Sequence, residues 1–362
     1  MIEPQTPMSD SKILSDTIQW LRLPMIVLVV LLHTIVLGQV AYDGRVIATP
    51  GEYYIFDKVC YISQRCIGDI AVPLFFVISG YLFFNSPTFN RQTFISKIKR
   101  RVKTLLIPYL LWNLSFLLFI WFLYIIYPPL MHSLASYLDN FDFITFIQSF
   151  WSINGSPVLA PFWFVRDLIV LSLLSYPLYY LIKKIGIIIL ILLLVLWCTK
   201  TAYDIPGIGI RSLFFYSFGA YFSIQKKEKL ISSINKYCGL IGLLWLIMLI
   251  ADAFIMRNTV FHQFFLFGGM VTVFSMAYYG VKNRVLRMPL FLSQSSFFVF
   301  SFHMFIINVP NKCWPIISPV NSMTCSLAQV TIPIIVTIIC VFSYGVLQKI
   351  FPQAISFFMG RR

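Results

Sequence analysis

Repeated runs of apolar residues, most of them about twenty residues long, are the feature that most restricts the fold of this chain. A helix needs about 20 apolar residues to cross the hydrocarbon core of a bilayer, and only helices and closed barrels satisfy their backbone polar groups in lipid. The runs therefore predict an all-α, polytopic integral membrane bundle of about ten transmembrane helices. They lie at 18–40, 67–88, 104–127, 162–182, 185–199, 207–224, 237–256, 259–280, 296–311 and 325–348.

The charged residues indicate how such a bundle is oriented. Only 11% of the residues are charged and the net charge is +15, whereas soluble domains are about 25% charged. A basic excess in a soluble protein would suggest nucleic acid, but in a membrane protein Lys and Arg mark cytoplasmic loops. With a cytoplasmic N-terminus, every inner loop is basic, whereas the 128–161 segment contains no Lys or Arg. We therefore expect both termini in the cytoplasm, a location in the inner (cytoplasmic) membrane and no nucleic-acid partner.

The chain is expected to form one membrane domain over residues 1–362, with short cytoplasmic tails at 1–17 and 349–362. No glycine-rich phosphate loop, nucleophile-elbow motif or internal repeat occurs in the sequence. The seven cysteines form no CxxC pair and no metal-ligand spacing with histidine, so no metal site is expected. A disulfide between Cys60 and Cys66, or between Cys313 and Cys325, is one possibility that the sequence leaves open. The commoner alternative is that these cysteines are structural or lipid-facing free thiols.

Arg22 and His33 interrupt the first apolar run, which reads LRLPMIVLVVLLHTIVL at 21–37. Eleven residues at 100° each amount to three turns and about 20°, so the two side chains share one helix face about 16 Å apart. Ionisable groups within a span are costly and usually face the protein interior or a cavity. The stripe indicates a cation near the cytoplasmic surface and a proton acceptor deeper in the membrane. Alternatively, Arg22 is a snorkelling, positive-inside residue, and His33 only hydrogen-bonds to a neighbouring helix.

Five segments together resemble the acyltransferase family 3 membrane proteins. The first run has the Arg-x10-His spacing of their first helix, and VPLFFVISGYLFF at 72–84 closely resembles their FFxxSGYL signature. The stretch KIKRRVKTLLIPYLLW at 97–112 is similar to the basic inner loop that leads into their Pro-Tyr-x-x-Trp. Two looser matches are FWFVRDLIV at 162–170, similar to Trp-Phe-x-x-Asp-Leu, and SFFVFSFHMFI at 296–306, similar to Tyr-x-x-His. The resemblance covers nearly the whole chain.

The chain departs from the family pattern in three respects. Many relatives have Asp three residues before the first-helix Arg, where this chain has Gln19. The Arg-x-x-Arg of the inner loop occurs only as Lys97-x-x-Arg100 or Arg100-x-x-Lys103, which keeps the charge but not the bidentate geometry of two arginines. An extracytoplasmic SGNH-type domain, which some relatives append, is not expected.

The resemblance implies a membrane O-acyltransferase, an enzyme that transfers groups other than aminoacyl groups. The implied donor is cytoplasmic acyl-coenzyme A, usually acetyl-coenzyme A (acetyl-CoA), as a substrate and not as a bound cofactor. The implied acceptor is a hydroxyl of a cell-envelope glycan, such as a surface polysaccharide, or of its lipid-linked precursor, and membrane lipids surround the enzyme. Transfer of succinyl or other acyl groups, and modification of antibiotics or lipids, stay open.

Acyl transfer to a sugar hydroxyl requires a base, stabilisation of the oxyanion and an anchor for the donor phosphates. His33 is the expected base, because neutral imidazole accepts a proton near pH 7; a covalent acyl-imidazole is the alternative. Arg22 and the basic inner loop are expected to hold the phosphates, although for the loop a pure topology signal is the alternative. The donor-binding candidates are Lys97, Arg100, Arg101, Lys103 and Ser79, and packing beside Gly80 is the preferred role of Ser79.

Four residues are candidates for the acceptor side. Trp163 is expected to stack on the sugar, while Arg166 and Asp167 either bind its hydroxyls or neutralise each other. Asp69 is the other acid near the outer side and would polarise His33. Arg211 is a weaker candidate for the acceptor side, and His132 and His262 belong to no motif.

His303, near the middle of its apolar run, completes the predicted catalytic set with His33 and Arg22, and a purely structural role is the alternative for this histidine.

A transporter or flippase of lipid-linked glycan would also carry intramembrane Arg and His. It would show repeat symmetry or paired broken helices, and the sequence indicates neither. A receptor-like or structural membrane protein would not need the Arg22–His33 stripe beside a donor loop. The sequence therefore favours the O-acyltransferase.

Overall fold

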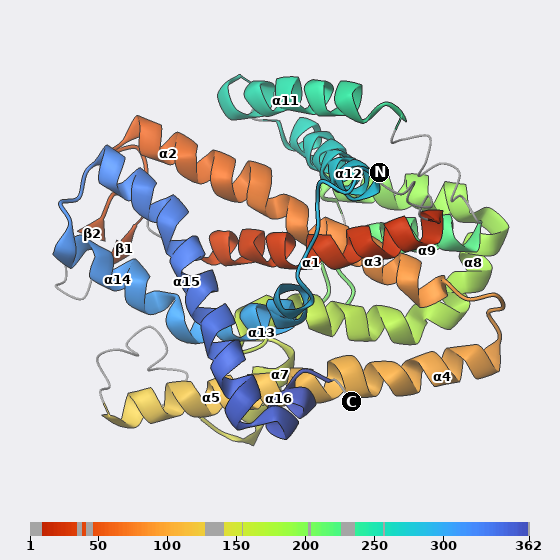
Figure 1. Ribbon diagram of the computed structural model, residues 1–362, viewed down its shortest axis with the longest axis horizontal. Helices are drawn as coiled ribbons and strands as arrows, with labels where there is room; N and C mark the ends of the chain where they lie inside the picture. Colours follow the sequence, from red (N-terminus) through yellow and green to blue (C-terminus); the bar gives the residue numbers. More distant parts are fainter. Residues whose placement is uncertain are drawn as a thin grey trace, which may run out of the picture. The chain divides into compact units, whose positions relative to one another are not determined.

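The computed structural model describes residues 9–34, 38–40, 46–126, 141–153, 155–201, 204–225, 236–255 and 258–360 (Figure 1). Most of the residues in these ranges are helical. Strand β1 (Gln39–Val40) pairs antiparallel with strand β2 (Val46–Ile47) in a short hairpin. The prediction of an all-α protein is thus confirmed for this part of the chain, whereas His132 and the basic residues at 226–229 lie outside it.

Six helical segments are long and apolar enough to cross a membrane. A seventh span results if α13 (Leu290–Ile306) and α14 (Asn308–Ile317), which meet at a bend of 53°, count as one. The described residues therefore form a multi-pass membrane protein, but the predicted number of ten spans is not confirmed, nor is the orientation of the termini. The six are α1 (Asp10–His33), Tyr54–Phe84, Arg91–Ile126, Ala160–Thr199, α12 (Thr259–Lys282) and α15 (Ser322–Ile350).

Helix length explains most of this difference in number. The predicted spans 162–182 and 185–199 lie in α8 (Trp163–Thr199), a 37-residue segment in which a kink at Ile185 (φ −136°, ψ 34°) divides two helices. Two further runs form α9 (Ile210–Ile224) and α11 (Cys238–Phe254), with 15 and 17 residues. Helices of this length rise about 22–26 Å, less than the roughly 30 Å of the hydrocarbon core. The predicted runs begin and end within three residues of these helices, so the difference lies in how many of them are long enough to count as separate spans.

Several stretches predicted as loops or tails contain helices. The 41–66 stretch contains α2 (Tyr54–Cys60) and most of the π-helix η1 (Tyr61–Ile67), which continues through η2 (Gly68–Ile70) into α3 (Ala71–Phe84). The other helices of this kind are α4 (Arg91–Arg101) in 89–103, α7 (Phe143–Trp151) in 128–161 and α16 (Pro352–Phe358) in the C-terminal tail.

Short polar side chains explain why two of these helices start where they do. Asn90 accepts the backbone N–H of Thr93 (2.8 Å) before α4, and Asp142 accepts that of Thr145 (2.7 Å) before α7. Such N-caps satisfy backbone N–H groups that have no partner inside the helix. Hydrogen bonds from the hydroxyl and backbone of Thr145 also hold the pKa of Asp142 below its ordinary value.

The contacts divide the chain into two compact units. Their boundaries fall within α3, α13 and α15, so each unit combines segments that are far apart in the sequence. The predicted single domain over 1–362 stays a prediction. Unit 1 comprises Met1–Ile78, Lys226–Val299 and Val309–Val341, and unit 2 comprises Ser79–Gln225, Phe300–Asn308 and Phe342–Arg362.

Unit 1 is organised around α1 and α12. Ile13 of α1 packs against Tyr278 and Val281 of α12 in a buried cluster. Helix α11 lies beside α12 (Figure 1). The η2 turn approaches α1 so closely that a Cβ on Gly68 would lie 2.8 Å from the side chain of Leu32. Small residues permit such close approach between membrane helices.

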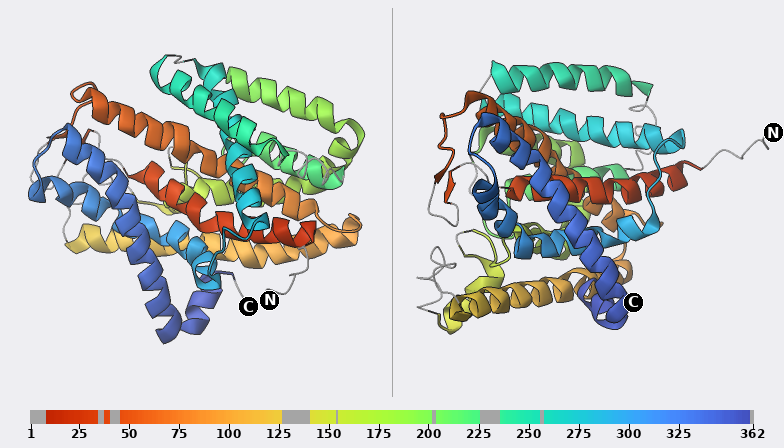
Figure 2. Two further views of the ribbon diagram at one scale, coloured as in Figure 1. Left: turned by 45° about the horizontal axis from the view of Figure 1, so that its top comes forward. Right: turned by 60° about the vertical axis from the view of Figure 1, so that its left-hand side comes forward.

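Unit 2 contains the paired helices α8 and α9, against which α3 ends. A Cβ on Gly80 would lie 2.1 Å from the backbone oxygen of Tyr216, so α3 and α9 are in backbone contact. This contact confirms close helix packing as a role of the glycine in FFVISG. Helix α4 continues through the π-helix η3 (Val102–Leu106) into α5 (Ile107–Ile126), and together they form one long rod (Figure 2).

Lysine side chains satisfy the carbonyl ends of two helices. Lys58 donates to the carbonyl of Ala253 at the end of α11, and Lys97 donates to that of Phe83 at the end of α3. The last carbonyls of a helix have no partner within the helix, so a lysine from a neighbouring helix can satisfy them. These contacts therefore fix where one helix ends against another.

Replacement of Gly80 by alanine is expected to destabilise the protein, because the added methyl group must displace the backbone of Tyr216. Overpacking costs about 1–3 kcal/mol, occasionally more, so the detergent-purified variant should unfold at a lower Tm than the wild type. Gly239→Ala on α11 is the matched control, because no atom lies within 4 Å of its Cβ position and alanine is favoured over glycine in a helix. An unchanged Tm for Gly80→Ala would contradict the close packing.

Candidate active site

Helix α1 carries the first predicted pair, Arg22 and His33, in unit 1. The helix is continuous from Asp10 to His33 and includes Pro24, so the spacing places both side chains on one face about 16 Å apart. The Arg22 side chain is exposed, and the His33 side chain is partly buried at the last position of the helix. The structure thus keeps a cation and an imidazole on one helix stripe, and what they bind stays a prediction.

The C-terminal end of α1 is held by the η1–η2 segment. Gln64 Nε2 donates to the carbonyl of Thr34 (2.7 Å), the residue after His33. Asp69 lies in η2, which packs against the last turn of α1, and its carboxylate pairs with Arg65 at 3.7 Å. Unit 1 therefore brings the segment of Asp69 to the end of α1 that carries His33, as its predicted role requires.

Two members of the predicted donor cluster face inward in unit 2. Lys97 lies 5.6 Å over the ring of Phe83, and the guanidinium of Arg101 lies 5.6 Å over the same ring. Cation–π contacts contribute about 0.5–2 kcal/mol. Together with the hydrogen bond from Lys97 to the Phe83 carbonyl, they hold α4 against the end of α3.

The other two cations of the cluster, Arg100 and Lys103, are exposed. Neither side-chain charge has an ion pair or hydrogen bond within the part of the chain that the structure describes. Lys103 lies in η3, and π-helical turns occur frequently at functional sites. Ser79 is partly buried and precedes Gly80 at the contact with α9, which agrees with its preferred packing role. Arg100 and Lys103 are therefore the members of the cluster best placed to meet an anion.

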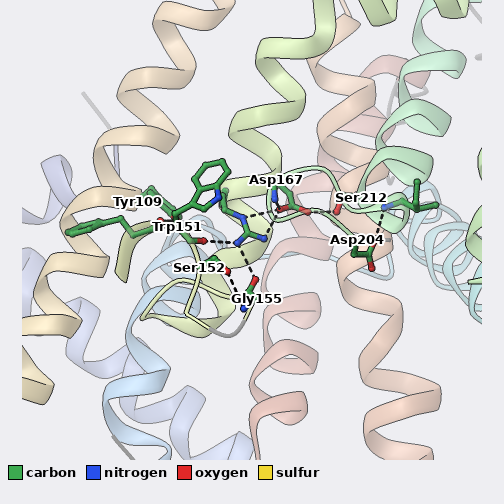
Figure 3. A network of polar contacts seen from close by, with 11 residues as sticks. Tyr109, Trp151, Ser152, Gly155, Asp167, Asp204 and Ser212 are labelled. Atoms are coloured by element: carbon green, nitrogen blue, oxygen red, sulfur yellow. Dashed lines mark hydrogen bonds and ion pairs between the residues drawn. The ribbon is translucent and has the colours of Figure 1, made fainter. Parts of the chain in front are cut away.

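Arg166 and Asp167, at the start of α8, form a buried network in unit 2 (Figure 3). The guanidinium donates to the carboxylate of Asp167 (3.1 and 3.3 Å) and to the carbonyls of Trp151 (2.7 Å) and Gly155 (3.1 Å). The carboxylate also accepts the hydroxyl of Ser212 (2.5 Å). Arg166 is 4% exposed and Asp167 2%, so each charge is compensated inside the protein.

This network joins α8 to two other segments of unit 2. Trp151 is the last residue of α7, and Asp167 reaches α9 through Ser212. Asp167 also accepts the N–H of Gly207 (3.1 Å), where a φ of +97° favours glycine. The geometry favours the alternative in which Arg166 and Asp167 neutralise each other and hold loops in place. Acceptor binding by either residue stays a prediction.

His303 lies fully buried at the end of an aromatic stack in unit 2. Its ring centroid is 6.4 Å from that of Phe300, which stacks on Phe162 (5.3 Å, 8°). Phe162 in turn stacks on Tyr109 (5.8 Å), so the stack connects α13, η5 (Ala160–Phe162) and α5. Trp163 is partly buried and begins α8 directly after η5. His303 and Trp163 thus belong to one packed region, while their predicted roles are untested by this packing.

Unit 1 contains a carboxylate–histidine pair that the sequence does not predict. Asp252 on α11 is fully buried, and its Oδ2 lies 2.9 Å from Nδ1 of His262 on α12. The signal present in the sequence is an acidic residue inside an apolar run, which usually has a partner. His262 could not be identified as that partner, because the pairing depends on how α11 packs against α12.

The cysteines and potential metal ligands carry no further site. All seven cysteines are free thiols, so neither disulfide that the sequence left open is present. Within the described ranges, no group of three or more His, Cys, Asp and Glu side chains could hold a metal ion.

Loss of one partner of the Arg166–Asp167 pair is expected to be strongly destabilising. Asp167→Asn or Arg166→Met leaves a buried charge without its counter-ion, which costs about 3–5 kcal/mol. The double variant Arg166→Met/Asp167→Leu removes both charges and should unfold at a higher temperature than either single variant. Thermal unfolding in detergent measures all three. Single variants as stable as the wild type would show that the network does not hold the fold.

Comparison with known proteins identifies the family. The profile of a family described as "Acyltransferase domain" matches residues 16–347. One curated relative is the succinoglycan biosynthesis protein ExoH of Rhizobium meliloti (strain 1021), 26% identical over 204 residues. That match covers 54% of this chain and 52% of the relative, so the chain spans about half the length of the curated relative it matches. No solved structure matches the chain. Because the profile match extends over most of the chain, the resemblance is confirmed, and this multi-pass membrane protein belongs to the acyltransferase family.

Proposed function

We propose that this protein is an O-acyltransferase that moves an acyl group from cytoplasmic acyl-coenzyme A to a hydroxyl of a cell-envelope polysaccharide or its lipid-linked precursor. Acetyl is the first acyl group to test, and succinyl the second. Family membership supports acyl transfer within a membrane, and the relative named for succinoglycan biosynthesis supports a polysaccharide acceptor. The proposed location is the cytoplasmic membrane, with both termini inside, as the basic loops indicate.

The observation that carries this proposal is the stripe of Arg22 and His33 on one continuous helix. A donor whose phosphates pair with the cation can extend its thioester arm along α1 toward the imidazole. Charged residues within a membrane span are costly and mark substrate pathways by default. A purely structural helix would not need both groups on one face.

In the proposed reaction, His33 removes the proton of the acceptor hydroxyl while the hydroxyl oxygen attacks the thioester carbonyl. The C–S bond then breaks, and the imidazolium returns the proton to the departing coenzyme A thiolate. Neutral imidazole suits both steps near pH 7. No covalent intermediate is required, although transient acylation of His33 would use the same geometry.

Arg100 and Lys103 are proposed to bind the donor phosphates. Their charged groups are exposed, whereas Lys97 and Arg101 are engaged with Phe83. Cationic side chains form strong, charge-assisted hydrogen bonds with phosphate. The proposal therefore narrows the predicted donor cluster to its two exposed members.

The bend between α13 and α14 favours a second candidate function. Transporters often bind their substrates at discontinuous helices, and this pair is bent by 53°. A transporter of lipid-linked glycan would move its substrate without an acyl donor. Labelling of polysaccharide from radioactive acetyl-CoA therefore separates the two functions.

His33→Gln is expected to abolish transfer while membrane insertion and acetyl-CoA binding are retained. The amide keeps polarity and much of the volume but is no base, and general-base catalysis contributes about 10²–10⁴-fold. The measurement is transfer of radiolabelled acetyl from acetyl-CoA to envelope polysaccharide in proteoliposomes, with a polysaccharide-free sample as the control for hydrolysis. Retention of more than about a tenth of the wild-type rate would exclude His33 as the base and make His303 the next residue to test.

Arg100→Ala combined with Lys103→Ala is expected to raise the KM for acetyl-CoA by roughly tenfold or more. A hydrogen bond to a charged group contributes about 1.5–3 kcal/mol, and about 1.4 kcal/mol corresponds to tenfold. Arg91→Ala is the matched control, because Arg91 lies nine residues earlier on α4, on the opposite face and about 13 Å from Arg100. An unchanged KM for acetyl-CoA in the double variant would show that Arg100 and Lys103 do not bind the donor and serve only as a topology signal.

A further inference from the structure

The buried pair of Asp252 and His262 in unit 1 has the geometry of a binding site outside the predicted active site. Asp252 Oδ2 accepts three groups: Nδ1–H of His262 (2.9 Å), the hydroxyl of Tyr61 (3.0 Å) and the thiol of Cys66 (3.6 Å). Tyr61 and Cys66 lie on η1, Asp252 on α11 and His262 on α12. Three segments therefore converge on one carboxylate oxygen.

The carboxylate determines which nitrogen of His262 is available. Because Nδ1 donates its proton to Asp252, Nε2 is left as a hydrogen-bond acceptor. No hydrogen bond to Nε2 occurs within the described ranges, and the His262 side chain is 19% exposed, against 0% for Asp252. The pair thus contains one oriented acceptor nitrogen, on a side chain of unit 1 that is partly exposed.

Asp252 also carries a polar atom whose partner is not accounted for. Its Oδ1 is buried and has no hydrogen-bond partner among the described residues. Buried polar atoms normally have a partner, and each exception requires an explanation. A partly exposed imidazole, oriented by a fully buried carboxylate and with no partner for its Nε2 among the described residues, points to a site that receives a polar group from outside the chain.

Two aromatic rings lie around Lys58, which contacts the end of α11 that carries Asp252. The Lys58 ammonium donates to the carbonyl of Ala253 and lies 5.6 Å from the ring centroid of Tyr54 and 5.0 Å from that of Phe254. These two rings are 67% and 55% exposed. Exposed aromatic faces combined with a few oriented polar groups suit a ligand with an apolar face and hydroxyl groups. A sugar ring has both.

We propose that His262, oriented by Asp252, binds a hydroxyl of the acceptor glycan through Nε2, with Tyr54 and Phe254 beside the sugar ring. This inference rests on the proposed function, which requires a glycan acceptor. The short connection between α11 and α12 is extracytoplasmic in the topology that the basic loops predict, where an envelope glycan would be met. His262 is a binding residue here, and the transferred proton and acyl group do not pass through it.

The test is direct binding of a defined glycan sample to the full-length protein in nanodiscs, measured by calorimetry. The probe is envelope polysaccharide from a strain that lacks the gene, with its ester groups removed by mild alkali. His262→Phe keeps the ring but loses the hydrogen bond, so its Kd should rise about three- to tenfold, the ratio for one neutral hydrogen bond. His262→Gln restores an acceptor oxygen while its amide N–H can donate to Asp252, and should recover most of the lost affinity.

Tyr61→Phe is the matched control. It also removes one hydrogen bond to Asp252 but leaves Nε2 of His262 untouched, so its Kd should stay within about twofold of the wild type. If the pair only holds η1 against the α11–α12 hairpin, Tyr61→Phe and His262→Phe will both lower the Tm and neither will change the Kd. That result, or equal Kd values for the wild type and His262→Phe, would overturn the inference.

Two further outcomes separate this inference from the proposed function. A wild-type protein that does not bind the polysaccharide would overturn the inference, because exposed rings would then face only the lipid interface. A wild-type protein that binds the polysaccharide through His262, yet transfers no acetyl or succinyl group from coenzyme A, would support this site and contradict the proposed function. In an active enzyme, His262→Phe should raise the KM for polysaccharide while the KM for the acyl donor is unchanged.

Discussion

Unpartnered carbonyl groups at helix ends place the strongest demand on this structure. The last carbonyl groups of a helix have no partner inside the helix, and a buried polar group without a partner is costly. In this protein, side chains from other segments repeatedly supply the missing donor, and each such contact determines which helix end lies against which neighbour. The pairs are Gln64 to Thr34 after α1, Lys97 to Phe83 of α3, Arg166 to Trp151 of α7, Lys58 to Ala253 of α11 and Trp112 to Phe358 of α16.

This demand changes how the charged residues are interpreted. In the sequence, Lys97 and Arg166 are both predicted to bind ligands, Lys97 as part of the basic inner loop and Arg166 as a cation within an apolar run. In the structure, both are engaged with helix ends, and Arg166 is also neutralised by Asp167. Candidates for binding are therefore the polar groups outside such contacts, such as Arg100 and Lys103 in unit 2 and Nε2 of His262 in unit 1.

The π-helix η1 shows how one short segment serves two neighbours. Its Gln64 holds the residue after α1, while Tyr61 and Cys66 hold Asp252 on α11. A π-helical turn has more residues per turn than an α-helix, so side chains close in sequence leave it in different directions. The end of α1 that carries His33 and the Asp252–His262 pair are thus connected through seven residues of the same unit.

The sequence alone determined the features that depend on local geometry. Apolar runs predicted a helical membrane protein, and the spacing of Arg22 and His33 predicted a shared helix face, because 3.6 residues per turn hold wherever a helix is continuous. The number of spans and the helices within predicted loops could not be predicted this way, since apolar composition does not reveal helices in the more polar segments or which apolar helices cross the membrane.

Tertiary structure decided which polar groups meet. Asp252 and His262 lie ten residues apart on two helices, and only the packing of α11 against α12 and η1 makes them partners. Likewise, the packing of α4 against the end of α3 determines which cations of the basic cluster face inward and which face outward. A helical pattern fixes the direction of a side chain relative to its own helix, whereas its partner depends on the neighbour that buries it, which no local spacing contains.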